Sequence, residues 1–254
     1  MIHTFGCEFE FSSSWDEVKE HASKAIAKYY GPNSLKAAKD WFRSRNNYKK
    51  WHLKLDSSTG CELCTPISTQ KDIKRIINVI RYLQDRVKIT KNDSLHVHVH
   101  AGDIKPELIV SSWLAIEKTI VRCFPKHRRQ KYKHSSYYCA QLIENSSNKN
   151  IVAKVFQQAL EFSDDHHSVL STHHYKSNKT VEFRIAEGTT DPDMIRNWVK
   201  FCLDFIRFSA DIDPFKILCS MSEKMCVDWM ADFLKIKDQD LRRWLNYRYD
   251  KFTH

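Results

Sequence analysis

The sequence predicts an α+β fold built on a largely antiparallel sheet, with additional helices at the C-terminal end. Three short segments, residues 6–11, 95–100 and 180–185, alternate apolar residues with Glu, His or Arg. Because successive side chains of a strand point to opposite faces, each segment is typical of a strand with one apolar and one polar face. Helical patterns separate these strands, and the glycine-rich motifs of Rossmann and P-loop folds do not occur.

The first part of the chain is predicted to begin with a strand followed by a capped helix. Ser14 with Glu17 at the third position forms a capping-box pattern, and Gly31 ends the helical periodicity. A turn signal at residues 57–60 separates two alternating runs, which predicts a hairpin with Asp56 at its rim. The expected elements are a strand over residues 1–11, a helix after Ser14, no definite element over 33–50, a hairpin over 51–66 and a helix over 71–87.

The second part is predicted to alternate helices with the two remaining polar-faced strands. Asp191 is a suitable N-cap and Pro192 suits the first helical position, so a helix is expected to begin there. Asp213-Pro214 then breaks the chain, which predicts one domain over residues 1–210 and a helical extension over residues 211–254 packed on it. The expected elements are a strand at 95–100, helices at 106–124 and 151–162, a basic loop at 125–150, a strand at 180–185, a helix to about 208 and two or three helices within 215–250.

Composition indicates a folded, globular protein. The 254 residues include 42% hydrophobic residues and seven Trp, enough for a substantial core. No run reaches the ~20 apolar residues that a membrane span requires. The N-terminal residues lack the basic and apolar regions of a signal peptide, so the eight Cys are expected to be reduced thiols of a cytoplasmic protein.

The net charge of +10 indicates either an acidic partner or a basic, solvated surface. The stretch 39–51 mixes bases with aromatic residues, as in proteins that stack nucleic-acid bases, and residues 126–134 are the densest basic run. The charge is nevertheless dispersed along the chain, which favours a solvated loop and helix face. A protein that binds or modifies nucleic acid therefore remains the alternative function.

Cys61 and Cys64 form a lone CxxC pair. A zinc site would need two further ligands at a matching spacing, and a redox site would need a thioredoxin-like context. Neither is present in the sequence. The pair is therefore interpreted as structural.

The polar faces of the predicted strands carry the candidate site residues. Carboxylates and imidazoles on strands of one sheet would form a site suited to Mg²⁺ or Mn²⁺, and an Arg beside them would suit a phosphate. The alternatives are a solvated strand face and cross-strand ion pairs. A metal-dependent hydrolase of the His/Glu type is a further alternative, although no HExxH motif occurs. The candidates are Glu8, Glu10, Glu62, His96, His98, Glu182 and Arg184, with His100 at the end of its strand.

The order of the motifs resembles that of the amidoligase family, which belongs to the superfamily of carboxylate–amine ligases that includes glutamine synthetase and glutamate–cysteine ligase. The resemblance covers roughly residues 3–208. Two departures occur: Ser57 stands where the family usually has Gly, and residues 171–175 differ from the family's Arg-Tyr and Asn. The motifs are Gly-x-Glu-x-Glu from residue 6, Asp-Ser-Ser from 56, Glu-Leu-Cys-Thr-Pro from 62, Leu-His-Val-His-Val from 95 and Thr-Val-Glu-Phe-Arg-Ile-Ala-Glu-Gly-Thr-Thr-Asp from 180.

This resemblance implies a curved antiparallel sheet with helices on its outer face, like the catalytic domain of glutamine synthetase. It also implies ATP and two or three Mg²⁺ ions as cofactors. ATP would phosphorylate the carboxylate of a small molecule or peptide. An amine would then attack the acyl phosphate to give an amide, ADP and phosphate.

The resemblance also implies roles for individual residues. Glu8, His96 and Glu182 match the ligands of the metal that bridges the nucleotide phosphates, and Glu10 and Glu62 match those of a metal near the acceptor carboxylate. The remaining assignments are Arg184 for the transferred phosphoryl group, His98 for an ATP phosphate, Asp56 as the general base that receives the amine, and Arg128, Arg129 and Lys131 for the carboxylate substrate.

Overall fold

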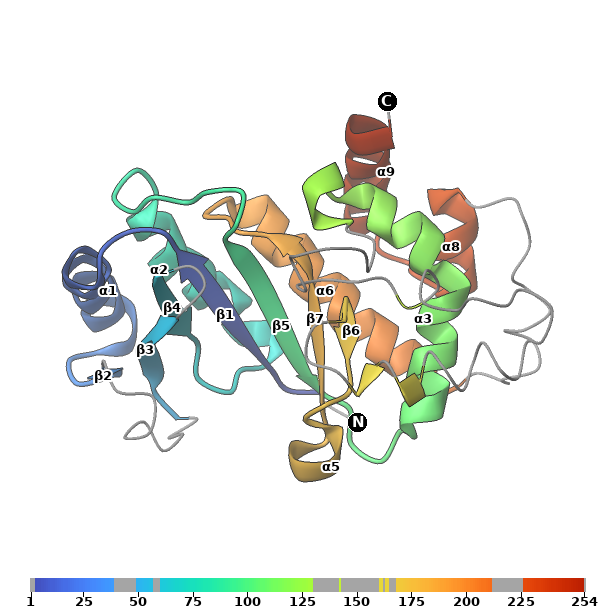
Figure 1. Cartoon of the computed structure of the whole chain (residues 1–254), viewed down its shortest axis with the longest axis horizontal. Coiled ribbons are helices and arrows are strands. Elements are labelled where there is room, and N and C mark those ends of the chain that lie inside the picture. Colours follow the sequence, from blue (N-terminus) through green and yellow to red (C-terminus); the bar gives the residue numbers. More distant parts are fainter. Residues whose placement is uncertain are drawn as a thin grey trace. The chain divides into compact units, whose positions relative to one another are not determined.

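The computed structural model describes residues 3–38, 49–56, 60–129, 142, 160–161, 163–164, 168–211 and 226–253. These residues form a mixed α/β structure with seven strands and seven α-helices (Figure 1). The chain divides into two compact units, Met1–His98 with Ala186–Val199, and Val99–Ile185 with Lys200–His254. Strands β5 (Ser94–His100) and β7 (Thr180–Glu187) and helix α6 (Pro192–Ser209) contribute residues to both units.

The first unit is built on strands in the order β2-β3-β4-β1-β5. Strand β4 is antiparallel to both β1 and β3, whereas β2 is parallel to β3. The hairpin predicted from the turn signal is therefore confirmed as β3 and β4. Strand β2 was not predicted, because its sequence lies in a polar stretch without alternation. The bounds are β1 Phe5–Phe11, β2 Leu35–Ala38, β3 Trp51–Asp56 and β4 Gly60–Cys64.

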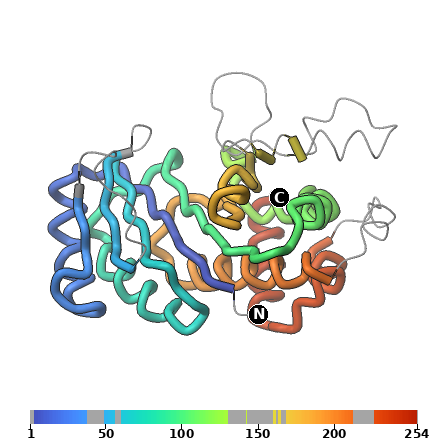
Figure 2. Tube along the Cα trace, turned by 90° about the horizontal axis from the view of Figure 1, so that it is seen from below, coloured from blue at the N-terminus to red at the C-terminus, as the bar shows by residue number. Residues whose placement is uncertain are grey.

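Two helices cover one side of these strands. Helix α1 (Trp15–Tyr30) begins as predicted, because the Ser14 side chain accepts a hydrogen bond from the Glu17 N–H at 3.4 Å. It ends at Gly31, whose φ of 91° favours glycine. Helix α2 (Ile73–Leu83) packs against α1, and α1 also contacts β3 and β4 (Figure 2).

The alternation of the strands places the core of the first unit on the helix side. Phe9 and Phe11 of β1 are almost fully buried, as are Leu53 of β3 and Leu63 of β4. The neighbouring residues along each strand project to the opposite face. The polar residues that the sequence placed between the apolar ones therefore share that second face. The helical contribution to the core comes from Val18, Ala22, Ala25, Ile26, Ile76, Ile77 and Ile80.

The second unit packs helices around an aromatic core. Trp113, Phe183 and Phe205 contact one another edge to face, with ring centroids 5.6–5.8 Å apart. The Arg248 side chain is buried and donates to the Cys123 carbonyl at 2.8 Å. Its described elements, besides parts of β5, β7 and α6, are α3 Pro106–Ile120, two short 3₁₀ helices at Val121–Cys123 and Lys126–Arg128, β6 Leu170–Ser171, α5 Tyr175–Asn178, α8 Val227–Phe233 and α9 Gln239–Thr253.

The predicted elements of the second half are largely confirmed where the structure describes them. The helix expected at 106–124 is α3 followed by a 3₁₀ turn, and Pro192 is the first residue of α6. The helix expected near 151–162 and most of the loop expected at 125–150 lie outside the described residues. No described helix is both long enough and apolar enough to cross a membrane.

Gly188 makes a close backbone contact inside the first unit. Its N–H donates to the Asp93 carbonyl at 2.8 Å, and a Cβ added to it would lie 2.7 Å from the Asp93 Cβ. The fully buried Asp93 carboxylate accepts hydrogen bonds from the Ser12 hydroxyl at 2.8 Å and from the Thr90 N–H at 2.5 Å. Because these hydrogen bonds hold Asp93 in place, its displacement by a larger residue at position 188 would be energetically unfavourable.

Gly188→Ala is therefore expected to lower the free energy of unfolding by about 1–3 kcal/mol through overpacking. Urea denaturation measures this change. Gly6→Ala is the matched control, because a Cβ there meets nothing closer than the Thr65 Oγ1 at 3.9 Å. The control is expected to stay within about 0.5 kcal/mol of the parent. Equal stability of both variants would contradict the steric argument.

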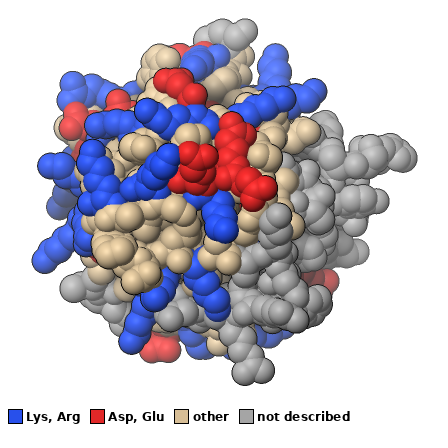
Figure 3. Space-filling view, turned by 90° about the vertical axis from the view of Figure 1, so that its left-hand side faces the viewer, with Lys and Arg blue, Asp and Glu red and all other residues tan. Residues whose placement is uncertain are grey.

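Lys and Arg side chains are spread over the face of the molecule shown in Figure 3, with acidic side chains among them. Helix α1 contributes the exposed Lys19 and Lys28, and α2 contributes Lys74 and Arg81. This mixture of charges is typical of a solvated surface. The basic and aromatic stretch at 39–51 lies mostly outside the described residues.

Candidate functional site

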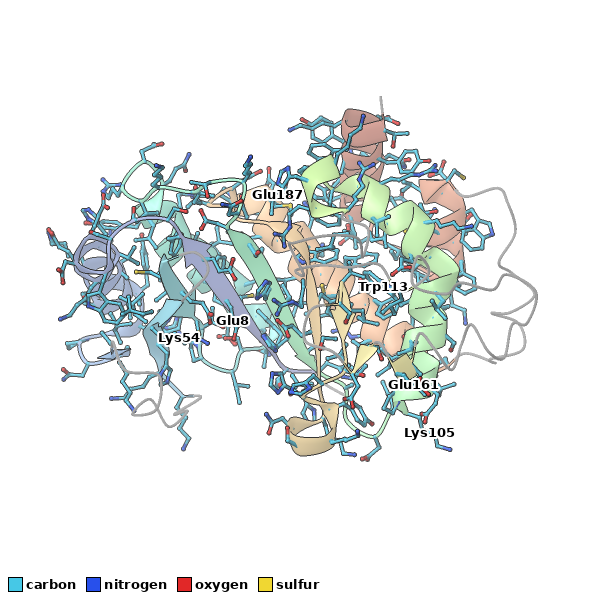
Figure 4. The ribbon with its side chains drawn as sticks, in the orientation of Figure 1. Glu8, Lys54, Lys105, Trp113, Glu161 and Glu187 are labelled. Atoms are coloured by element: carbon cyan, nitrogen blue, oxygen red, sulfur yellow. The ribbon has the colours of Figure 1, made fainter. Side chains whose placement is uncertain are left out.

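Seven polar side chains of the first unit gather on the sheet face opposite α1 and α2. Cross-strand pairing places Glu8 beside Cys64, and Glu10 beside Glu62. Lys54 is paired with Glu62 from the other side. Figure 4 labels Glu8 on β1 and Lys54 on β3. These side chains form an acidic cluster, which consists of Glu8, Glu10, Lys54, Glu62, Cys64, His96 and His98.

The two histidines of β5 contact the glutamates of β1. The His96 Nδ1 lies 3.5 Å from the Glu8 Oε2, and the His96 Nε2 lies 3.7 Å from the Glu10 Oε1. The His98 Nε2 lies 3.3 Å from the same Glu8 Oε2. Each of these three distances is short enough for a metal ion or a proton to lie between the two atoms. The alternating imidazoles therefore share a face with the alternating carboxylates, as the sequence predicted.

Lys54 bridges two of the carboxylates. Its Nζ lies 2.6 Å from the Glu62 Oε1 and 3.8 Å from the Glu8 Oε1. The Cys64 thiol donates to the same Glu62 Oε1 at 3.0 Å. Ligand atoms of Glu8, Glu62 and Cys64 lie within 4.8 Å of one another, close enough to share one metal ion.

Burial and neighbouring charges shift the pKa values of Glu8 and Glu62 in opposite directions. Burial would raise the pKa of Glu8, but the charges of His98 and Lys54 and the hydrogen bonds from the imidazoles hold it well below its usual range. Burial and the negative charge of Glu8 raise the pKa of Glu62 to about 8, against the opposing charge of Lys54. Burial and the adjacent carboxylates also raise the pKa of the Cys64 thiol, so this sulfur stays protonated near neutral pH.

Divalent-ion binding at Glu8 is consequently expected to depend on the protonation of Glu62. A divalent ion beside Glu8 would favour the ionised form of the neighbouring Glu62, so the affinity for Mn²⁺ or Mg²⁺ should rise with pH up to about 8, the pKa of Glu62. If one proton is released, the slope is roughly tenfold per pH unit below that pKa. Calorimetry in buffers of different ionisation enthalpy measures the released proton. Glu62→Gln should abolish the proton release, and a pH-independent affinity of the parent would contradict the expectation.

Glu182 and Arg184 lie in the second unit, on one face of β7. Glu182 is only 3% exposed, and its carboxylate forms an ion pair with the Arg184 guanidinium. The neighbouring strand β6 places Ser171 opposite Glu182. Their position on one strand face was predicted from the alternation with Val181, Phe183 and Ile185, whereas their ion pair with each other was not.

The remaining candidates are Asp56, Arg128, Arg129 and Lys131. Asp56 is the last residue of β3, and its side chain lies outside the described part of the structure, as does Lys131. Arg128 donates to the carbonyls of Ile185 and Arg184 at 3.2 and 2.7 Å, so its buried guanidinium holds the strand β7 backbone. Arg129 likewise donates to carbonyls of Phe124, Arg122 and Phe252, at 2.7–3.0 Å.

Sequence reasoning missed two members of the acidic cluster, Lys54 and Cys64. Both follow the same rule as the residues that were predicted, since each lies two positions from another residue of the polar face. Cys61 and Cys64 are three positions apart on β4, so they project to opposite faces and cannot bind one ion together. The cysteines that the structure describes carry free thiols.

The sequence matches a known protein family. Residues 2–206 match the family described as putative amidoligase enzyme, and the chain belongs to this family. The family is one of ligases that form amide bonds, so the resemblance predicted from the motif order is confirmed.

No curated protein sequence matches the chain. Among solved structures, the chain is similar to a bifunctional glutathione synthetase from Pasteurella multocida, with 12% identity and a TM-score of 0.46. The match covers 99% of this chain and 47% of that one, so this chain spans about half the length of the synthetase.

Proposed function

We propose that this protein is an ATP- and Mg²⁺-dependent carboxylate–amine ligase that forms an amide bond through an acyl phosphate. The observation that carries the proposal is the acidic cluster in a member of an amidoligase family. Three carboxylates and two imidazoles on neighbouring strands are an arrangement that binds divalent ions, and phosphoryl transfer from ATP requires such ions.

The chemistry of the cluster fits Mg²⁺ or Mn²⁺. Carboxylate oxygens of Glu8, Glu10 and Glu62 are the hard ligands that these ions prefer, and the His96 imidazole suits Mn²⁺. Bound Mg²⁺ would neutralise phosphate charge during phosphoryl transfer. We assign Glu182 as a further metal ligand and His98 as a contact to an ATP phosphate, following the order of the family motifs.

The proposed reaction has two steps. A carboxylate oxygen of the first substrate attacks the γ-phosphorus of ATP, which forms an acyl phosphate and releases ADP. The Arg184 guanidinium would stabilise the charge of the transferred phosphoryl group. An amine then attacks the acyl carbon, the phosphate leaves and a proton passes from the amine to Asp56 as general base. The products are an amide, ADP and phosphate.

The same proposal extends to the fold and the substrates. We propose a curved sheet of the glutamine synthetase type, a catalytic domain over residues 1–210 and a helical extension over 211–254. The family match, which ends at residue 206, supports this boundary. The substrates would be a small-molecule or peptide carboxylate and an amine.

Hydroxylamine provides a test that does not require the natural amine. Hydroxylamine attacks an acyl phosphate to give a hydroxamate, which ferric ion detects by colour. The protein, incubated with ATP, Mg²⁺, hydroxylamine and a panel of amino acids and dicarboxylic acids, should form a hydroxamate with at least one acid and release ADP in equal amount. ADP release without hydroxamate, for every acid that stimulates it, would overturn the acyl-phosphate route.

Binding of an ATP analogue offers a second, substrate-independent measurement. A non-hydrolysable analogue with Mg²⁺ should raise the melting temperature, because a ligand that binds only the folded state stabilises it. A melting temperature indifferent to millimolar analogue and Mg²⁺, combined with salt-sensitive binding to random DNA, would favour the nucleic-acid alternative.

A further inference from the structure

We infer that the Lys54 ammonium fills one cation position of the acidic cluster, so that the first unit takes a single divalent ion there. This inference rests on the proposed function, in which the cluster holds the metal. The resemblance to the family implied two or three ions instead, with Glu10 and Glu62 assigned to a metal near the acceptor carboxylate. Lys54 thus determines the metal content of the site.

The geometry puts the ammonium where a second ion would have to bind. The Lys54 Nζ lies 2.6 Å from the Glu62 Oε1, and the Cys64 thiol donates to the same oxygen at 3.0 Å. Three ligand atoms, one each from Glu8, Glu62 and Cys64, lie within 4.8 Å of one another. A divalent ion at this point would therefore have to displace the ammonium from Glu62.

Displacement is unfavourable because both partners are largely removed from solvent. The Lys54 side chain is 12% exposed and that of Glu62 is 6% exposed. An ammonium pushed away from Glu62 at this depth would lose a charged partner without gaining water in exchange. Its second neighbour, Glu8 at 3.8 Å, also attracts it toward the centre of the cluster. The charge of Lys54 is therefore held in place from two sides.

The charge balance of the cluster agrees with a single ion. Within the first unit, the three carboxylates in their ionised form and the one ammonium sum to two negative charges when the histidines are neutral. One divalent ion balances these charges. The two His contacts of Glu8, at 3.5 and 3.3 Å, identify the side of the cluster where this ion would bind, away from the Lys54–Glu62 pair.

A purely structural ion pair between β3 and β4 is the alternative role for Lys54. Such a pair would affect stability but not the number of ions bound. The number of bound ions therefore separates the two roles, and Mn²⁺ alone is a sufficient probe because free Mn²⁺ gives an electron paramagnetic resonance signal that disappears on binding.

The experiment compares Mn²⁺ binding by the parent and by Lys54 variants. The parent is expected to bind a single tight ion. Lys54→Met and Lys54→Gln should each bind a second ion. Their affinity for this second ion should be at least ~10²-fold higher than that of the parent, because a unit positive charge at ~4 Å is removed. Lys54→Arg keeps the charge and should keep the single ion. Lys74→Met removes an exposed ammonium of α2 and should also bind as the parent does.

Melting temperatures provide the control for folding. Lys54→Met leaves Glu8 and Glu62 without this counter-charge, so it should melt lower than the parent without metal and recover more than the parent when Mn²⁺ is added. Equal ion numbers in the parent and in both neutral variants would overturn the inference, while leaving the proposed ligase intact. Two tight ions in the parent would overturn it as well. A parent that binds no Mn²⁺ would overturn both the inference and the metal dependence of the proposed function.

Discussion

Replacement of Arg184 by Ala is expected to lower ATP turnover by ~10²–10³, the usual effect of losing a preorganised charge at a developing transition state. Arg184 forms an ion pair with Glu182 on one face of β7. The proposed function assigns its guanidinium to the transferred phosphoryl group. Its loss should therefore lower the rate of ADP formation more than the affinity for Mn²⁺. Hydroxamate and ADP assays with the same acid measure the rate.

Two further variants separate catalysis from folding at this strand. Glu182→Gln keeps the shape of a side chain that is 3% exposed and leaves Arg184 an amide oxygen to bind. It should remain folded, yet lose turnover through weaker metal binding. Arg184→Lys keeps the charge but loses the planar guanidinium, so it should retain part of the activity. Turnover at the parent rate in Arg184→Ala would remove Arg184 from the mechanism.

Glu8→Gln is expected to weaken Mn²⁺ binding by at least ~10²-fold. Mutation of residues that only orient a metal ligand already lowers metal affinity by ~10–100-fold. Glu8 lies within 3.5 Å of both His96 and His98, and within 3.8 Å of Lys54. ATP turnover should fall in parallel and should recover in part at high Mn²⁺ concentration.

Glu20→Gln is the matched control for this substitution. Glu20 is an exposed carboxylate of α1 that pairs with Lys24 across one helical turn. Its neutralisation removes the same charge from the first unit without touching the acidic cluster. Unchanged Mn²⁺ affinity in Glu20→Gln, together with a large loss in Glu8→Gln, would locate the effect in the cluster. Similar small losses in both would refute the role of Glu8.

The alternating strands could be predicted because one residue in two was chemically unambiguous. In β1, the apolar Cys7, Phe9 and Phe11 fixed the buried face, so Glu8 and Glu10 had to share the other. The same logic placed His96 and His98 together on β5. Strand β2, at Leu35–Ala38, escaped prediction because it lies on the edge of the first unit and shows no such alternation.

The contents of the cluster were less predictable than its existence. Lys54 belongs to the face of β3 that meets Glu62, but a lone Lys in a strand usually indicates a solvent-exposed position. Only the cross-strand register and the contacts of its Nζ show that it lies between the carboxylates of Glu62 and Glu8. Likewise, Gly188 and Asp93 lie 95 residues apart, and nothing in either local sequence indicates that their backbones meet.

The division of the chain has a consequence for experiments that cut the protein. Residues 99–185 of the second unit are inserted between the two segments of the first, and residues 200–254 complete the second unit. A fragment that keeps the whole first unit must therefore extend from residue 1 to residue 199, and it then carries an incomplete second unit. Removal of residues 211–254 would take away the Arg248 side chain that is bonded to the Cys123 carbonyl. In this division the C-terminal helices α8 and α9 share a unit with residues 99–185, so a truncation at residue 210 would leave that unit incomplete.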